Sequence, residues 1–233
     1  MKAVILAAGR GTRMKELTDA LPKPMLKVGE RTLLEHKFDI LGPEFDEIIL
    51  IVGYQAEVIR AAFGDSYKGI PLRYVMQERL DGTMGALALA RPYLTERFVV
   101  MMGDDIYAEA DVAKTLAVGD WAMLLEDMEH MAAGGRIITN EEGKVTAIEE
   151  GDHRGEPGLF NTNMFALDPR VFDYPMVPKA AGSDEFGLPQ TVLAASIASG
   201  IPLHAVHTTW WIQITAPEDL IKAEALIEVN AQK

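Results

Sequence analysis

The chain of 233 residues contains no cysteine. This absence excludes a disulfide scaffold, thiolate catalysis and a cysteine-ligated metal. Long apolar runs are also missing, because no window approaches the roughly 18 uninterrupted apolar residues typical of a membrane-spanning helix. The first residues lack the apolar core of a secretory leader as well. We therefore expect a cytoplasmic protein with no membrane partner.

Basic residues are few compared with acidic ones. Lys and Arg number 22 against 35 Asp and Glu, which gives a formal net charge of -13. Nucleic acids and anionic membranes attract basic patches, so we expect neither as a partner. A small anionic ligand stays compatible with this composition, because a few cations can act inside a focused cleft.

Strand-like and helical segments alternate in the first half of the chain. Strands are predicted at 2–6, 47–52, 72–76 and 98–102, and helices at 32–41, 55–63 and 84–90. This alternation predicts an α/β fold of the three-layer α/β/α Rossmann-like type, with a mostly parallel mixed sheet. Ligands of such folds bind at the carboxyl ends of the strands.

The second half is less regular. Its predicted strands are 121–126 and 159–167, with a hairpin of 136–139 and 145–149 around a turn at 140–143, extended segments at 203–206 and 208–212, and helices at 190–199 and 217–229. No internal repeat and no linker interrupts the chain. We expect a single domain over residues 1–233.

A loop of small residues follows the first predicted strand. Ala7, Ala8, Gly9 and Gly11 leave the backbone bare, so that amide groups can approach a polyphosphate closely. The spacing is not that of a dinucleotide-binding fingerprint, because the third glycine is replaced by Met14. A P-loop is excluded too, since no G-x-x-x-x-G-K-[ST] pattern is present.

The stretch from Leu6 to Leu26 reads L-A-A-G-R-G-T-R-M and then P-K-P-M-L. It resembles, almost residue for residue, the signature of the sugar-1-phosphate nucleotidylyltransferases, also called nucleoside-diphosphate-sugar pyrophosphorylases. The length resembles the short form of that family, without a C-terminal left-handed β-helix. The resemblance implies a nucleotidyltransferase domain with a nucleotide-binding half at about 1–110 and a sugar-phosphate-binding half at about 111–233.

The resemblance also implies the residues of the nucleotide site. Those expected to contact the nucleotide are Leu6, Ala7, Ala8, Gly9, Gly11, Thr12, Arg13, Gln77, Gly82 and Thr83. A Gln followed by Gly-Thr before an alanine-rich helix is similar to the base-binding region of uridylyl and thymidylyl transferases. UTP or dTTP is therefore the expected nucleotide, with guanosine and cytidine still open.

Catalysis is assigned to Arg13, Lys23 and Asp104. Charge accumulates on the transferred phosphoryl group, and two cations on a loop can stabilise it and the leaving pyrophosphate. Asp104 follows the apolar run 98–102, where a parallel sheet presents side chains to its ligand, and a carboxylate there can hold Mg²⁺. The family's Gly-Asp motif implies the same metal role. No side-chain nucleophile is needed, because an oxygen of the sugar phosphate can attack in line.

For the sugar phosphate, the resemblance implies Glu150, Asn161 and Glu185 as hydrogen-bonding residues. Two departures affect this half. The Lys of the family's E-K-P motif is missing after Glu150, and Arg154 or Lys179 is a candidate replacement. The family's W-x-D motif reads Trp211-Ile212-Gln213, so the second metal position holds a neutral Gln213.

The expected reaction is Mg²⁺-dependent transfer of a nucleotidyl group from an NTP to a sugar 1-phosphate, giving an NDP-sugar and pyrophosphate. Two alternatives stay open. A phosphocholine-type cytidylyltransferase would need an aromatic cage, which Phe160, Trp210 and Trp211 could supply. A catalytically silent nucleotide-sugar sensor is the alternative from another class. The sequence also leaves a homo-oligomer open.

Overall fold

The computed structural model describes residues 1–231, and the side chains of all of these except 132, 133 and 231. The strands are β1 (Lys2–Ala7), β2 (Lys27–Val28), β3 (Arg31–Thr32), β4 (Glu47–Val52), β5 (Ser66–Tyr67), β6 (Ile70–Met76), β7 (Phe98–Met102), β8 (Asp105–Tyr107), β9 (Trp121–Thr139), β10 (Val145–Leu167), β11 (Leu203–His207) and β12 (Trp211–Gln213). The α-helices are α1 (Leu17–Ala20), α2 (Leu33–Asp39), α3 (Ala56–Phe63), α4 (Thr83–Ala88), α5 (Glu109–Ala117), α6 (Leu188–Ser199) and α7 (Pro217–Ala231). Short 3-10 helices are η1 (Thr12–Met14), η2 (Lys23–Met25), η3 (Arg91–Tyr93) and η4 (Pro169–Asp173).

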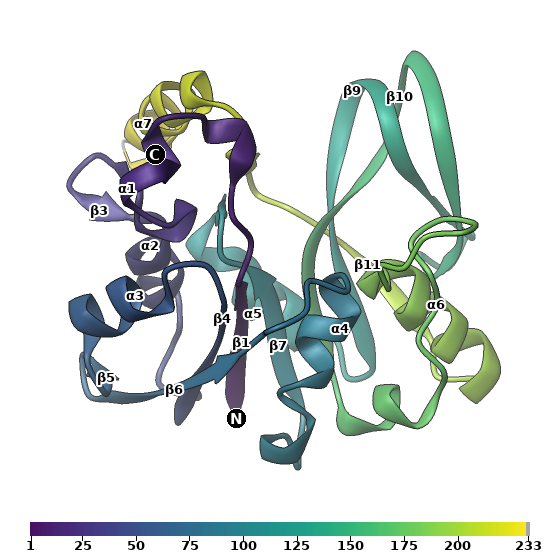
Figure 1. Ribbon diagram of the computed structural model, residues 1–233. Helices are drawn as coiled ribbons and strands as arrows, with labels where there is room; N and C mark the ends of the chain where they lie inside the picture. The colour runs from purple at the N-terminus through teal and green to yellow at the C-terminus, as the bar shows by residue number, and fades with distance from the viewer. Residues whose placement is uncertain (232–233) are drawn as a thin grey trace.

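Eight strands form the main sheet in the order β11-β9-β10-β7-β1-β4-β6-β5. β1 lies at its middle and runs parallel to both β4 and β7, and β4 runs parallel to β6. β10 runs antiparallel to β7 and to β9. The sheet is thus mixed, with parallel pairing from β7 through β1 and β4 to β6, which confirms the predicted fold class (Figure 1).

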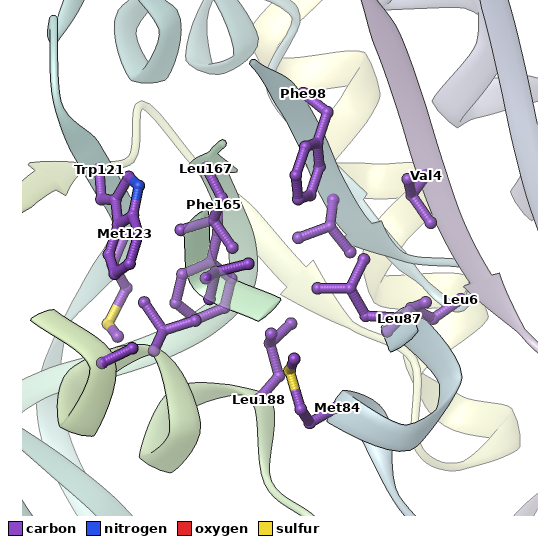
Figure 2. Close-up of a cluster of buried hydrophobic side chains, with 14 of the residues drawn as sticks. Val4, Leu6, Met84, Leu87, Phe98, Trp121, Met123, Phe165, Leu167 and Leu188 are labelled. Carbon is purple, nitrogen blue, oxygen red and sulfur yellow. The ribbon is translucent and has the colours of Figure 1, made fainter. Parts of the chain in front are cut away.

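Helices cover both faces of this sheet because the central strands are apolar on both sides. Val4 and Leu6 of β1 pack into one cluster, with Met84 and Leu87 of α4 and Leu188 of α6 (Figure 2). The intervening residues Ala3 and Ile5 pack into the opposite cluster, which contains residues of α2, α3 and α5. Side chains of a strand alternate between faces, so a fully apolar strand requires a layer on each side.

β9 and β10 are much longer than the short strands predicted at 121–126, 136–139, 145–149 and 159–167. They continue beyond the sheet as a curved antiparallel arm (Figure 1), whose register shifts repeatedly. The predicted turn is present, and Asn140 Oδ1 accepts hydrogen bonds from the backbone of Glu142 and Lys144. The polar residues between the apolar runs hid the continuity, because an arm outside the core carries little hydrophobic signal.

β8 and β12 form a separate antiparallel pair that places Gln213 opposite Asp105. The extended segment predicted at 208–212 is thus centred slightly later, and α5 was not predicted at all. After β12 the chain enters α7, which packs through Ala223 on Val28 of β2 and its neighbours in a third apolar cluster. Within residues 1–231 we find no helix long and apolar enough to span a membrane.

Candidate active site

Two adjoining cavities open at the carboxyl ends of β1 and β7. The larger has a volume of about 480 Å³ and the smaller about 240 Å³. Leu6, Gly9 and Met102 line both. The two cavities therefore adjoin at the point where the parallel strands end, the position at which α/β sheets bind ligands.

The smaller cavity is cationic and lies under the glycine loop. Its walls include Gly9, Gly11, Thr12, Arg13, Lys23, Asp104 and Thr215. Gly9 has open space where a side chain would stand, so a ligand can reach its backbone. Gly11 serves another purpose: its φ is +65°, and a Cβ there would lie 2.7 Å from Lys23 Cβ. The missing side chain at Gly11 lets the Lys23 stem pass.

Lys23 and Asp104 form an ion pair at the floor of this cavity. Lys23 Nζ donates to Asp104 Oδ2 at 2.6 Å, and the Lys23 side chain is only 6% exposed. Pro22 and Pro24 hold the lysine backbone in the short η2 helix. A loop residue and a strand-end residue, 81 positions apart, are thus brought into direct contact in the lining of the smaller cavity.

Two fully buried titratable side chains, Lys37 and Asp105, interact electrostatically next to this ion pair. Burial lowers the pKa of Lys37 to about 8, although Asp105 and Asp104 act in the opposite direction. Burial, and then the negative charge of Asp104, raise the pKa of Asp105 well above its usual range. Asp105 Oδ2 accepts from Trp211 Nε1 at 3.2 Å and from Tyr107 Oη at 3.4 Å. Within the described residues, neither Lys37 Nζ nor Asp105 Oδ1 has a hydrogen-bond partner.

The lining of the larger cavity includes the predicted base-binding residues Gln77, Gly82 and Thr83. Gln77 stands immediately after β6 and its backbone N–H donates to Val52 O at 2.8 Å. A Cβ on Gly82 would overlap the main chain of Phe186, so the glycine is required for this packing and not only for ligand approach. Thr83 Oγ1 accepts from the backbone of Leu188 at 2.9 Å.

The same lining also contains the predicted acceptor residues Glu150, Asn161 and Glu185. Glu150 Oε1 accepts from Gln190 Nε2 at 2.9 Å. Asn161 Nδ2 donates to Asn163 Oδ1, and Asn161 Oδ1 accepts from the Asn163 backbone, both at 2.9 Å. Asn163 has a φ of +58°, a conformation that Asn tolerates better than most residues.

Lys179 and Glu185 lie on facing segments, and both line the larger cavity. The backbone N–H of Lys179 donates to Glu185 O at 2.8 Å, and their side chains form an exposed ion pair at 3.5 Å. Lys179 is the only Lys or Arg among the described residues that line the larger cavity. Arg154, the other candidate for the missing lysine, lies in the β9–β10 arm and lines neither cavity.

Every predicted site residue except Gln213 lines at least one of the two cavities. Gln213 instead lies in β12, where it pairs with Asp105, the residue that follows Asp104 in the sequence. The prediction missed several lining residues, among them Leu80, Met102, Gly134, Gly135, Ile137, Ile148, Asn163, Gly187, Pro189, Gln190 and Thr215. Most are apolar or small, and only the folded β9–β10 arm brings Gly134 and Gly135 to the site.

Two of the three residues predicted for an aromatic cage around choline do not line the larger cavity. Phe160 lines it, but Trp210 and Trp211 do not. Trp211 packs on Phe160 with ring centroids 5.8 Å apart, and its indole nitrogen donates to buried Asp105. The tryptophan thus supports the wall of the cavity from behind.

Comparison with known proteins places this geometry in a family. The chain is 30% identical to the UTP–glucose-1-phosphate uridylyltransferase AglF of Haloferax volcanii, over 98% of this chain and 97% of that protein. It is 27% identical to a D-glycero-α-D-manno-heptose 1-phosphate guanylyltransferase of Aneurinibacillus thermoaerophilus, over 96% and 97%.

Solved structures share the fold. A Bacillus anthracis protein, assigned as a glucose-1-phosphate thymidylyltransferase and crystallised with sucrose, superposes with a TM-score of 0.83 at 23% identity, covering 97% of this chain and 94% of that one.

The family model described as nucleotidyl transferase matches residues 2–230. The chain therefore belongs to the nucleotidyl transferase family, as one of its sugar-1-phosphate nucleotidyltransferases.

Proposed function

We propose that the protein transfers a uridylyl or thymidylyl group from UTP or dTTP to a sugar 1-phosphate, in a reaction that depends on Mg²⁺. The observation that carries this proposal is that the two cavities share part of their lining. A cationic cavity lined by Lys23, Arg13 and Asp104 adjoins a larger cavity lined by Gln77 and Glu150. That arrangement suits a triphosphate beside a base and a polyhydroxyl acceptor.

The geometry supports direct displacement. An oxygen of the acceptor phosphate would attack the α-phosphorus of the nucleotide, and the bond from that phosphorus to the bridging oxygen would break, releasing pyrophosphate. The acceptor phosphate already carries a nucleophilic oxygen, so no protein base has to remove a proton. Arg13 and Lys23 would stabilise the charge that builds on the leaving pyrophosphate.

The donor set fits a magnesium ion shared with the nucleotide. Asp104 presents a hard carboxylate at the cavity floor, with one oxygen held by Lys23. In the described part of the chain, no three His, Asp or Glu side chains gather into a metal-binding group. Mg²⁺ in proteins often binds one or two carboxylates, with substrate phosphates and water as the other ligands. Asp104 would therefore hold the ion, with the Gln213 carbonyl as a candidate second ligand.

When bound, the ion would neutralise phosphate charge and lower the barrier to displacement. Asp104 would orient it, and Lys23 would keep the Asp104 carboxylate in place. The Gly9 backbone would contact the phosphates, because open space stands where a side chain would be. Glu150, Asn161 and Glu185, which line the larger cavity, would receive sugar hydroxyls.

The relatives support uridine as the first choice of base, since AglF is named for UTP and glucose 1-phosphate. The guanylyltransferase relative makes GTP the necessary competitor in any test. A cytidylyltransferase for phosphocholine is disfavoured because two of the three expected cage residues lie outside the cavity.

The test is pyrophosphate release with Mg²⁺, using UTP, dTTP, CTP and GTP against glucose 1-phosphate, other sugar 1-phosphates and phosphocholine. We expect release only when both substrates are present, with UTP or dTTP and a sugar 1-phosphate. Removal of Mg²⁺ with EDTA should abolish it. If no pair of substrates releases pyrophosphate but the protein binds a nucleotide sugar tightly, the protein is a catalytically silent sensor and not an enzyme.

A further inference from the structure

A hydrogen bond next to the larger cavity fixes the orientation of the Gln77 side chain. Gln77 Nε2 donates to Asp81 Oδ1 at 3.1 Å. Gln77 is only 7% exposed and lines the larger cavity, whereas Asp81 does not line it. The carboxylate thus holds the glutamine amide from the side away from the ligand space.

The chemistry of the two groups allows only one orientation of the amide. A carboxylate accepts hydrogen bonds, while an amide has a donating nitrogen and an accepting oxygen. The Gln77 nitrogen must therefore face Asp81, because the opposite orientation would set two acceptors against each other. None of the hydrogen bonds within residues 1–231 uses Gln77 Oε1. The oxygen is the amide atom left for a ligand.

Both partners are anchored through the backbone. The Gln77 N–H donates to Val52 O, and Asp81 O accepts from the Phe186 N–H at 2.7 Å. Gly85 gives the carboxylate its space, since a Cβ at Gly85 would overlap the Asp81 side chain. The pair therefore keeps its geometry before any ligand arrives, which makes the orientation of Gln77 a fixed property of the site.

A fixed acceptor discriminates between bases by their ring nitrogen. Uracil and thymine carry N3–H, which can donate to Gln77 Oε1, and guanine carries N1–H. Cytosine N3 and adenine N1 are acceptors and would oppose the oxygen. A site that places a buried acceptor against another acceptor loses affinity by the cost of two unpaired groups.

We propose that Asp81 is a specificity-determining positioning residue: by fixing the Gln77 amide, it makes the enzyme select bases with a ring N–H and reject cytosine. The inference rests on the proposed function, because it concerns the nucleotide of that reaction. Asp81 acts only through Gln77 and is not itself a catalytic residue.

The test compares kcat/KM for UTP and CTP, with glucose 1-phosphate as acceptor, in the wild type and in Asp81→Asn. The asparagine side chain has nearly the same shape but carries both a donor and an acceptor. The Gln77 amide can therefore adopt either of its two orientations. We expect kcat/KM for CTP to rise and the UTP-to-CTP ratio to fall by about tenfold or more. Glu78→Gln removes an exposed carboxylate one residue from Gln77 and should leave the ratio unchanged.

A second variant separates orientation from simple loss of structure. Gln77→Met fills the same space without either polar atom, so kcat/KM for UTP should fall with no gain for CTP. A parallel fall for both nucleotides in Asp81→Asn, or an unchanged ratio in a folded variant, would overturn the proposal. Wild-type inactivity with every nucleotide would instead contradict the proposed function.

Discussion

At the scale of single residues, the site depends on side chains that are missing as much as on those present. Gly11 has no Cβ to obstruct Lys23, and Gly82 has none to obstruct Phe186. Lys23 in turn contacts Asp104 at 2.6 Å. The predicted glycine loop lines the smaller cavity, but the contacts that explain Gly11 and Gly82 involve residues distant in sequence.

Arg13 should matter for the rate more than for acceptor binding. Its charge is placed in the cavity proposed for the triphosphate, where it would act on the transition state. We expect Arg13→Ala to lower kcat by roughly 10²-fold while KM for the sugar phosphate changes little. Arg10→Ala is the matched control, since Arg10 is on the same loop, stacks on Tyr54 and lines neither cavity. A loss confined to KM would make Arg13 a general anion anchor.

Asp104 should be indispensable for the metal-dependent reaction. Asp104→Asn keeps the shape and a carbonyl oxygen for Lys23 but removes the charge that would hold Mg²⁺. We expect no Mg²⁺-dependent turnover and a melting temperature close to that of the wild type. Normal turnover in the folded variant would refute the metal role of Asp104.

At the scale of elements, the start of α7 shows how one side chain joins strand and helix. Asp219 Oδ2 accepts from the backbones of Thr215 and Ala216 and from the Thr215 hydroxyl, each at 2.9 Å. Despite partial burial, these bonds and Lys222 hold the pKa of Asp219 well below its usual value. Thr215 also lines the smaller cavity, so the cap positions part of the site.

Asp219→Ala should lower the free energy of unfolding by about 1–2 kcal/mol at pH 7. Because the folded-state pKa is depressed, the charge-dependent part of this stabilisation is present above the ordinary value of 3.8 and is lost as the pH falls below it. Urea unfolding at pH 7 and pH 3 should show the difference from wild type narrowing. Glu218→Ala, at the exposed neighbouring position, is the control; an equal effect there would mean that the helix dipole, and not the cap, is responsible.

The parallel strands and most helices could be predicted from sequence because their residues are apolar in regular patterns. β1 and β4 are continuous apolar runs, and α2 begins with a capping box between Thr32 and Glu35. The β9–β10 arm could not be predicted as two long strands, since residues outside the core carry no such pattern. The lack of an apolar pattern in this arm also explains why Gly134 and Gly135 were not predicted to line the cavity.

At the scale of the whole molecule, two buried titratable side chains that interact electrostatically connect the core to the site. Lys37 of α2 and Asp105 of β8 are both fully buried, and Asp105 contacts Tyr107, which donates to Thr162 O at 2.9 Å. In the sequence, Thr162 lies between Asn161 and Asn163, which both line the larger cavity. No sequence pattern indicated this connection, because a lysine on a short helix is ordinarily exposed.

Lys37→Met should destabilise the protein by on the order of 3 kcal/mol, since it leaves a buried carboxyl group without its compensating charge. The double variant Lys37→Met/Asp105→Asn should lose clearly less than the sum of the two single changes. Chemical unfolding of all four proteins measures this coupling. Additive losses would mean that the two groups do not interact.

The central claim is that the two cavities form one site of direct nucleotidyl transfer. The most direct measurement is the stereochemical course at phosphorus, using UTP made chiral at the α-phosphate with sulfur and glucose 1-phosphate as acceptor. A single in-line displacement predicts inversion in the sugar nucleotide. Retention would contradict the account, because it would require a covalent nucleotidyl-enzyme, with Lys23 as the nearest candidate nucleophile.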